Sequence, residues 1–154
     1  MNRRKFLTLS VATAMVLPLG AWATDYRTLK PTAWTAKSVP DAVKGLYGDV
    51  DFIKSDDIAL KMPKIASNGG AVPVRISSDI KAKSVALFQD SNPESAVAVW
   101  DVAEDGIIDY TLKLKLKKKE SGVDTKVVVV VEGVDGKFYT KSEKITVSIG
   151  GCEG

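Results

Sequence analysis

The only cysteine of the chain, Cys152, is the third residue from the C-terminus and follows two glycines. A thiol is a nucleophile that can be oxidised, paired with another thiol or loaded with a substrate. Because there is no second cysteine, an internal disulfide and a CxxC metal or redox motif are both excluded. This end of the chain therefore favours chemistry on one sulfur atom that is free, joined to another chain or covalently loaded.

Gly150 and Gly151 predict an exposed position for this sulfur, since glycines widen the backbone's conformational range and have no side chain to pack. At about 3.3–3.6 Å per residue, the segment from Ile149 to Cys152 reaches roughly 10 Å. We expect residues 150–154 to form a thin, flexible arm that carries the thiol into a cleft of another protein. An incidental cysteine on a disordered tail is the alternative.

The neighbours of the thiol are acidic. The Glu153 side chain and the terminal carboxylate of Gly154 disfavour a thiolate, so the local sequence does not lower the pKa of Cys152. Activation of the sulfur has to come from the site that the arm enters.

The rest of the composition lacks catalytic groups. The 154 residues include no histidine, which excludes a Ser-His-Asp or Cys-His arrangement and histidine ligands for zinc, copper or haem. Asp49, Asp51, Asp56 and Asp57 lack the glycine-containing loop of an EF-hand, and we interpret them as solvated turn residues, not as a calcium or acid/base site. We predict a non-catalytic protein without a metal or cofactor.

The N-terminus has the pattern of an export signal. Arg3 and Arg4 precede Phe6 and Leu7, an apolar stretch follows, and an A-x-A site ends at Ala23. The paired arginines predict a cleaved twin-arginine signal over residues 1–23, export in the folded state and a periplasmic location. An ordinary secretory signal or an uncleaved anchor helix are the alternatives.

Cleavage of this signal changes the charge balance. The chain has 22 basic and 19 acidic residues, a net charge of +3, and the signal contains three basic residues and no acidic one. The mature chain is thus expected to carry 19 of each, which argues against nucleic-acid binding. We also expect no membrane contact after cleavage.

One helix is predicted at the start of the mature chain. Ser38-Val39-Pro40-Asp41 is typical of a helix N-terminus, and the apolar residues after it, Ala42, Val43 and Leu46, share one face. We expect Trp34, Tyr47 and Phe52 to be core residues that dock this segment.

Period-two alternation dominates from Ile58 onward. Residues 108–117 alternate apolar and polar side chains without a break, whereas Val127–Val131 is a continuous apolar run, typical of a strand covered on both faces. Asp135-Gly136 predicts a hairpin turn. The other expected strands are residues 58–62, 72–77, 84–89, 96–102, 137–140 and 144–149. About seven short strands predict one antiparallel, immunoglobulin-like β-sandwich over residues 24–149.

The one cluster of like charges consists of five lysines, Lys113, Lys115, Lys117, Lys118 and Lys119. We interpret it as the solvated face and end of a strand that opposes edge-to-edge pairing. A docking patch for an acidic partner is the alternative.

Several segments, taken together and in order, resemble the SoxY family, the sulfur-carrier subunits of bacterial thiosulfate oxidation. They are Pro63–Gly69, Val72–Val74, Asn92-Pro93, Asp135–Tyr139 and the ending Val147-Ser148-Ile149-Gly150-Gly151-Cys152. A twin-arginine signal is also a feature of this family. One departure is Glu153, at a position where the family tail usually has glycine.

This resemblance implies an immunoglobulin-like sandwich that pairs with a SoxZ-like subunit and carries sulfur intermediates covalently on Cys152. It further implies a SoxXA-like haem cytochrome that couples thiosulfate to the thiol and a SoxB-like hydrolase that releases sulfate. Where present, a SoxCD-like dehydrogenase oxidises the remaining sulfane sulfur. The residues alone leave one alternative, an exported structural module joined to a partner through an intermolecular disulfide.

Overall fold

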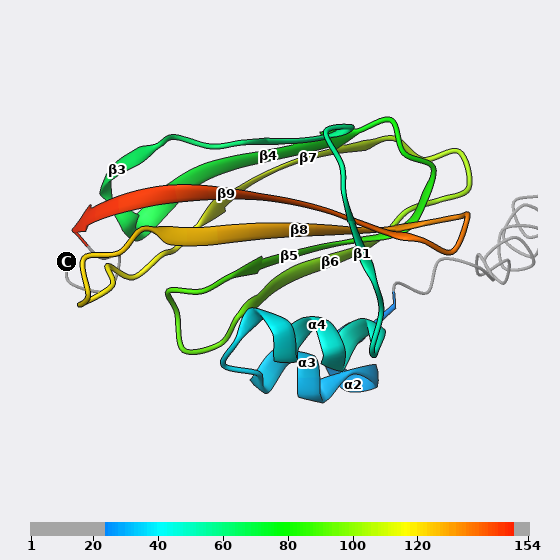
Figure 1. The fold of residues 1–154 in the computed structure, drawn as a ribbon, viewed down its shortest axis with the longest axis horizontal. Coiled ribbons are helices and arrows are strands. Elements are labelled where there is room, and N and C mark those ends of the chain that lie inside the picture. Colours follow the sequence, from blue (N-terminus) through cyan, green and yellow to red (C-terminus); the bar gives the residue numbers. More distant parts are fainter. Residues whose placement is uncertain (1–23, 150–154) are drawn as a thin grey trace, which may run out of the picture.

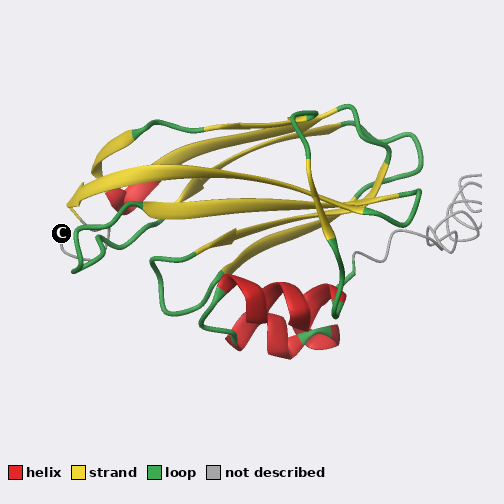
Figure 2. Cartoon of the chain, viewed as in Figure 1, coloured by secondary structure: helices red, strands yellow, loops and turns green. Residues whose placement is uncertain are grey.

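The computed structural model describes residues 24–149, which form a β-sandwich covered on one outer face by short helices (Figure 1). Figure 2 shows that strands are the main secondary structure and that the α-helices lie together against one sheet. The prediction of an immunoglobulin-like, mainly antiparallel sandwich is confirmed. No helix among residues 24–149 is both long and apolar enough to cross a bilayer.

The larger sheet has the order β1-β9-β8-β5-β6, and β3 pairs with β9 beyond the end of β8. The smaller sheet has the order β2-β4-β7. In chain order, the strands are β1 Phe52–Lys54, β2 Ile58–Lys61, β3 Ile65–Asn68, β4 Val72–Ser78, β5 Ala82–Gln89, β6 Ala96–Asp101, β7 Ile108–Leu114, β8 Thr125–Gly133 and β9 Phe138–Ile149. A 3₁₀ turn, η1 (Gly69–Ala71), separates β3 from β4.

Strand β9 organises the larger sheet. Residues 137–140 and 144–149, expected as two strands, belong to this single strand of twelve residues. It pairs antiparallel with β8 and, along its other edge, parallel with β1 at Phe138–Thr140 and with β3 at Thr146–Ile149. The sequence analysis did not predict β1 and β3, which are only three and four residues long and lack a clear alternation.

The core between the sheets follows the predicted alternation. Ile108 and Leu114 of β7 are buried while Asp109 and Lys113 are exposed. The continuous run of β8 is buried on both faces, as predicted: its odd-numbered valines, Val127, Val129 and Val131, face the smaller sheet, and Val128 and Val130 pack against the helices. Each such apolar side chain contributes about 1.5–3 kcal/mol by burial.

The predicted helix is α4 (Val39–Tyr47), and it begins as expected. The Ser38 hydroxyl accepts a hydrogen bond from the Asp41 N–H, Pro40 occupies the first turn, and Ala42, Val43 and Leu46 are buried. Two shorter helices, α2 (Tyr26–Leu29) and α3 (Pro31–Thr35), precede it and were not predicted.

The three aromatic residues expected in the core differ in their burial. Trp34 and Tyr47 are partly buried and pack against the helix-facing core. The expectation that Phe52 is a core residue is wrong, because this side chain is 43% exposed. It lies on β1, whose three residues are all exposed, and it contacts Phe138 only edge-on, with ring centroids 6.4 Å apart.

The β8–β9 hairpin turn is where the sequence predicted it. Gly136 has a φ of +79°, a conformation that glycine adopts without strain, and the Gly133 N–H donates to the Lys137 carbonyl at 2.8 Å. The Asp135 carboxylate accepts from the Tyr139 hydroxyl at 2.7 Å, which fixes the turn to the start of β9.

Candidate functional site

The residues predicted to carry the chemistry, Gly150, Gly151, Cys152, Glu153 and Gly154, lie outside the described residues. The export residues Arg3, Arg4, Phe6 and Leu7 lie outside them as well. What the structure describes is the platform from which the predicted arm continues, namely the end of β9 and the loops around it.

The end of β9 is held along one edge by β3. Pairing with β8 stops at Thr125 and Ile145, and beyond this point β9 pairs with β3 through Val147 and Ile149. The Thr146 N–H donates to the Lys64 carbonyl at 2.9 Å. Because Ile145 and Val147 point into the core, the backbone is anchored almost to the first residue of the predicted arm.

The segment Asn68-Gly69-Gly70 between β3 and β4 is a tight turn. The Asn68 side-chain oxygen accepts from the Gly70 N–H at 2.7 Å, and the Gly69 carbonyl accepts from the Leu116 N–H at 2.8 Å. This turn therefore joins the end of β3 to the segment that follows β7.

The other side of β9 faces the loop between β7 and β8. The Thr146 hydroxyl donates to the Asp124 carboxylate at 2.7 Å. A shallow depression of about 290 Å³ lies between this loop and β9, lined by Lys118, Lys119, Gly122, Val123, Thr125, Thr146, Val147 and Ser148. Lysine side chains thus lie directly beside the last residues of the strand.

The predicted lysine cluster has two kinds of members. Lys119 pairs with Asp90 at 2.9 Å and is only partly exposed, whereas Lys113, Lys115, Lys117 and Lys118 are exposed and pair with no carboxylate among residues 24–149. Lys113 lies on β7, an edge strand of the smaller sheet, where lysine opposes pairing with another chain.

A buried glutamine fixes the loop next to these lysines. The Gln89 side chain is 1% exposed; its oxygen accepts from the N–H groups of Ser91 and Asn92, and its amide donates to the Glu94 carbonyl. The Asn92 amide in turn donates to the Lys115 carbonyl at 2.7 Å and accepts from the Lys117 N–H at 3.0 Å. The sequence analysis named Asn92-Pro93 as part of the resemblance but did not predict this network.

A second polar chain lies away from this end, between α4 and the larger sheet. The Ser84 hydroxyl donates to Glu132 at 2.9 Å, so the Tyr47 hydroxyl, 3.0 Å from Ser84, donates to Ser84. Burial raises the pKa of Tyr47, with a smaller raising contribution from the negative charge of Glu132, and the hydrogen bond with Ser84 acts in the opposite direction. A phenol held protonated in this way fixes the helix to the sheet and is not a general base.

The carboxyl groups with lowered pKa are also distant from the end of β9. Hydrogen bonds to their ionised forms lower the pKa of Asp56 beside Lys141, of Asp109 beside Arg75 and of Asp135 beside Tyr139. Asp56 and Asp49 each pair with a lysine, in agreement with solvated turn residues. Over residues 24–149, no three histidine, cysteine, aspartate or glutamate residues are grouped to hold a metal ion.

Comparison with known proteins places this architecture in a family. The family model described as sulfur oxidation protein SoxY matches residues 43–152. No curated protein matches the chain.

Solved structures with a similar fold include a member of the same family. The sulfur carrier protein SoxY from Chlorobium limicola f thiosulfatophilum is 28% identical over 72% of this chain and 96% of that chain, with a TM-score of 0.63. A superoxide reductase (neelaredoxin) from Ignicoccus hospitalis is 14% identical over 62% of this chain and 94% of that chain, with a TM-score of 0.53. The second likeness concerns the fold alone.

Proposed function

Because the chain belongs to the SoxY family of sulfur oxidation proteins, we propose that it is a covalent carrier of sulfur intermediates in thiosulfate oxidation, with Cys152 as the attachment site. The observation that carries this proposal is the extent of the family match, which ends at Cys152 and so includes the preceding glycines. The similar Chlorobium structure is that of a protein named as a sulfur carrier.

The platform at the end of β9 supports a carrier role. Pairing with β3 holds the strand through Ile149, so the three residues to Cys152 start from a fixed point. Three residues span at most about 10 Å, and a partner has to approach the end of the sandwich this closely to reach the sulfur.

The loading step is an oxidation. The thiol of Cys152 and thiosulfate form a sulfur–sulfur bond, which gives a cysteine S-thiosulfonate and releases one proton and two electrons. The SoxXA-like haem cytochrome takes up these electrons. The sequence offers no internal oxidant or base for this step, which is why we propose a carrier and not an enzyme.

Three further steps regenerate the carrier. A SoxB-like hydrolase adds water to the terminal sulfonate sulfur, so that sulfate leaves and a persulfide stays on Cys152. Where present, a SoxCD-like dehydrogenase oxidises the outer sulfur of the persulfide to a sulfonate with oxygen from water and takes up the electrons. Hydrolysis of the sulfur–sulfur bond then releases sulfate and frees the thiol. A SoxZ-like subunit pairs with this chain to complete the carrier. This chain itself holds no cofactor in the proposal.

We place these steps in the periplasm. Residues 1–23 have the twin-arginine pattern with Arg3 and Arg4, and a thiol carrier that is to be oxidised suits a compartment outside the reducing cytoplasm. The pathway's export of folded proteins permits the SoxZ-like subunit to cross together with this chain.

The proposal is tested by intact mass spectrometry of the purified chain after incubation with thiosulfate and the haem cytochrome. We expect a sulfur-containing addition on Cys152 that a reductant removes, and no addition to the Cys152→Ser variant. The chain offers a matched control: Cys152→Ser combined with Ser148→Cys moves the single thiol to an exposed position on β9 itself. This thiol is expected to react with a small alkylating reagent but not to be loaded, since it does not project from the strand.

Equal loading of the relocated thiol contradicts the role of the arm. A stable disulfide-linked species as the main form in the periplasm supports the alternative, a structural module joined to its partner through Cys152.

A further inference from the structure

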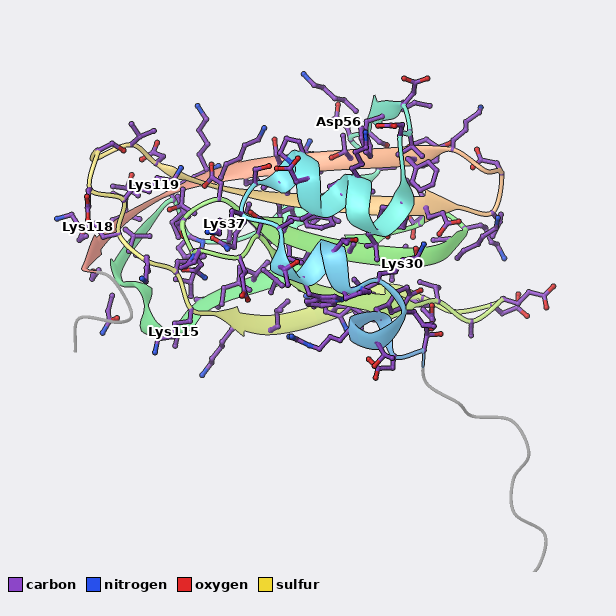
Figure 3. All side chains as sticks on the ribbon, turned by 90° about the horizontal axis from the view of Figure 1, so that it is seen from below. Lys30, Lys37, Asp56, Lys115, Lys118 and Lys119 are labelled. Carbon is purple, nitrogen blue, oxygen red and sulfur yellow. The ribbon has the colours of Figure 1, made fainter. Side chains whose placement is uncertain are left out.

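Three exposed lysines, Lys115, Lys117 and Lys118, form what we call the lysine patch. They follow β7 in the loop that leads to β8, and Lys118 lines the depression beside Thr146, Val147 and Ser148 of β9. Figure 3 shows Lys115 and Lys118 at the end of the molecule where β9 terminates, with Lys30 and Asp56 nearer the other end. The patch therefore lies at the end of the molecule from which the arm continues.

The backbone of the patch is fixed from two directions. Leu116 is fully buried between two patch lysines, and its N–H donates to the Gly69 carbonyl. Asn92 binds the carbonyl of Lys115 and the N–H of Lys117. Because neighbouring side chains alternate in direction, burial of Leu116 directs Lys115 and Lys117 to solvent. Three cations are thus presented on an ordered surface, with no carboxylate partner among residues 24–149.

The two ends of the sandwich differ in charge. The loops at the far end, residues 55–57, 79–81, 102–107 and 134–137, contain two lysines and six acidic residues: Asp56, Asp57, Asp79, Glu104, Asp105 and Asp135. At the arm end, residues 62–64, 69–71, 90–95 and 115–124 contain five lysines and four acidic residues. Two of these acidic residues have partners: Asp90 pairs with Lys119, and Asp124 accepts a hydrogen bond from the Thr146 hydroxyl. Counted over these loops, the charge is −4 at the far end and +1 at the arm end, and Glu153 on the arm offsets the latter. The chain therefore has a charge dipole along its strands whose far end is negative.

Because the arm is short, the lysine patch lies within the interface of any complex in which a partner reaches Cys152. A partner that takes the sulfur of Cys152 into its active site comes within roughly 10 Å of Ile149, and its rim then contacts the loops that surround the end of β9. Charges at the rim of an interface act mainly on the rate of association, by factors of about 10–1,000 at low ionic strength.

From this arrangement we propose that the lysine patch is the docking surface for an acidic rim around the active-site entrance of the enzymes that act on Cys152. The inference rests on the proposed function, because it presumes that enzymes visit the arm. It concerns the partner protein and not the small substrate: the patch orients the carrier as it approaches, arm end first, through its cations and the dipole.

The test compares two triple variants with the same change of net charge. One removes the patch (Lys115→Gln, Lys117→Gln and Lys118→Gln), and the matched control removes three exposed lysines elsewhere (Lys30→Gln, Lys54→Gln and Lys137→Gln). Association with the haem cytochrome that loads Cys152 is followed by stopped flow between 20 and 500 mM NaCl, with thermal unfolding as a check on folding. These salt limits are about the range over which the Debye length falls from roughly 20 Å to below 5 Å.

We expect the patch variant to associate about tenfold or more slowly than the unsubstituted chain at the lowest salt, with the difference vanishing at the highest salt. The control variant should stay within about twofold. Equal rates for the two variants, or salt-independent association of the unsubstituted chain, overturn the proposal. So does a patch variant that raises the KM for thiosulfate alone, because the lysines would then act on the small anion.

These outcomes are separable from failure of the proposed function. If Cys152 of the unsubstituted chain is not loaded at all, as intact mass shows, the carrier role fails. If it is loaded and the patch variant is loaded at the same rate, the carrier role stands and only the docking surface is wrong.

Discussion

Asn92 is the residue that joins the loop after β5 to the patch segment. Its amide makes two hydrogen bonds to the backbone of Lys115 and Lys117, and removal of a hydrogen-bonding side chain typically costs about 1 kcal/mol. We expect Asn92→Ala to lower the free energy of unfolding by roughly 1–2 kcal/mol and to speed amide hydrogen exchange at Lys117. Ser55→Ala, at the far end, serves as the control. Unchanged exchange at Lys117 in the Asn92 variant contradicts this role.

At the level of single residues, the sequence was informative where chemistry depends on residue type. One cysteine, no histidine and two glycines suffice to predict an exposed single thiol without catalytic groups of its own, because these facts do not depend on the fold, whereas the carrier role came from the resemblance. The environment of Asn92 and Gln89 was not predictable. Their partners lie on other elements, and turn residues such as Asn-Pro carry a local signal without naming the strands they contact.

Among the elements, the contact between α3 and α4 is unusually close at Gly45. A Cβ at this position would lie 2.7 Å from the backbone nitrogen of Ala33 and 2.8 Å from its Cα, so a side chain forces the helices apart. We expect Gly45→Ala to lower the free energy of unfolding by about 1–2 kcal/mol, although alanine is otherwise favoured over glycine in a helix by roughly 1 kcal/mol.

Urea unfolding measures this change. Lys44→Ala, on the exposed face of the same helix, should alter stability by less than about 1 kcal/mol, because its ion pair with Asp49 is solvent-exposed. A Gly45 variant that is as stable as the unsubstituted chain, or more so, contradicts the close-packing account.

The sequence predicted α4 and every strand except β1 and β3, although it expected β9 as two strands. The clearest signals, those of β7, β8 and α4, combine a regular apolar pattern with a turn or cap, and the shorter expected strands correspond to β2, β4, β5 and β6. Strands β1 and β3 were missed because their pairing is set by the exposed edge of β9, a tertiary feature. Phe52 was misplaced for the same reason, since an aromatic residue on a short edge strand packs along one side only.

For the whole molecule, the absence of histidine predicts a broad pH plateau of stability. Ionised Asp109, hydrogen-bonded by Arg75, has a lowered pKa, so its contribution is complete above about pH 4, the ordinary pKa of aspartate, and is lost as pH falls through the lowered value. Tyr47 has a raised pKa through burial, so its contribution is present below about pH 10 and is lost as pH rises through the raised value.

The chain has no histidine, the side chain whose ordinary pKa lies near 6.5. We therefore expect a midpoint of thermal unfolding that is flat between about pH 4 and 10 and falls below and above this range. A step near pH 6–7 contradicts the prediction. Tyr47→Phe should weaken the alkaline fall and leave the acid limb unchanged.

The distribution of charge can be described only for the molecule as a whole. The expected mature chain has equal numbers of acidic and basic residues, yet its acidic loops gather at one end and the lysine patch lies at the other. Composition alone predicted the first property. The second required the topology, because the strands alternate in direction and bring loops far apart in sequence to the same end.

The proposed function requires that sulfur is carried covalently on Cys152. The most direct test of this requirement is the mass of the native chain, isolated without any reductant from the periplasm of thiosulfate-grown cells. We predict a mixture of masses above that of the residue 24–154 polypeptide, with all sulfur additions on the C-terminal peptide and all removed by reduction. A single unmodified mass, or additions that persist in the Cys152→Ser variant, would contradict it.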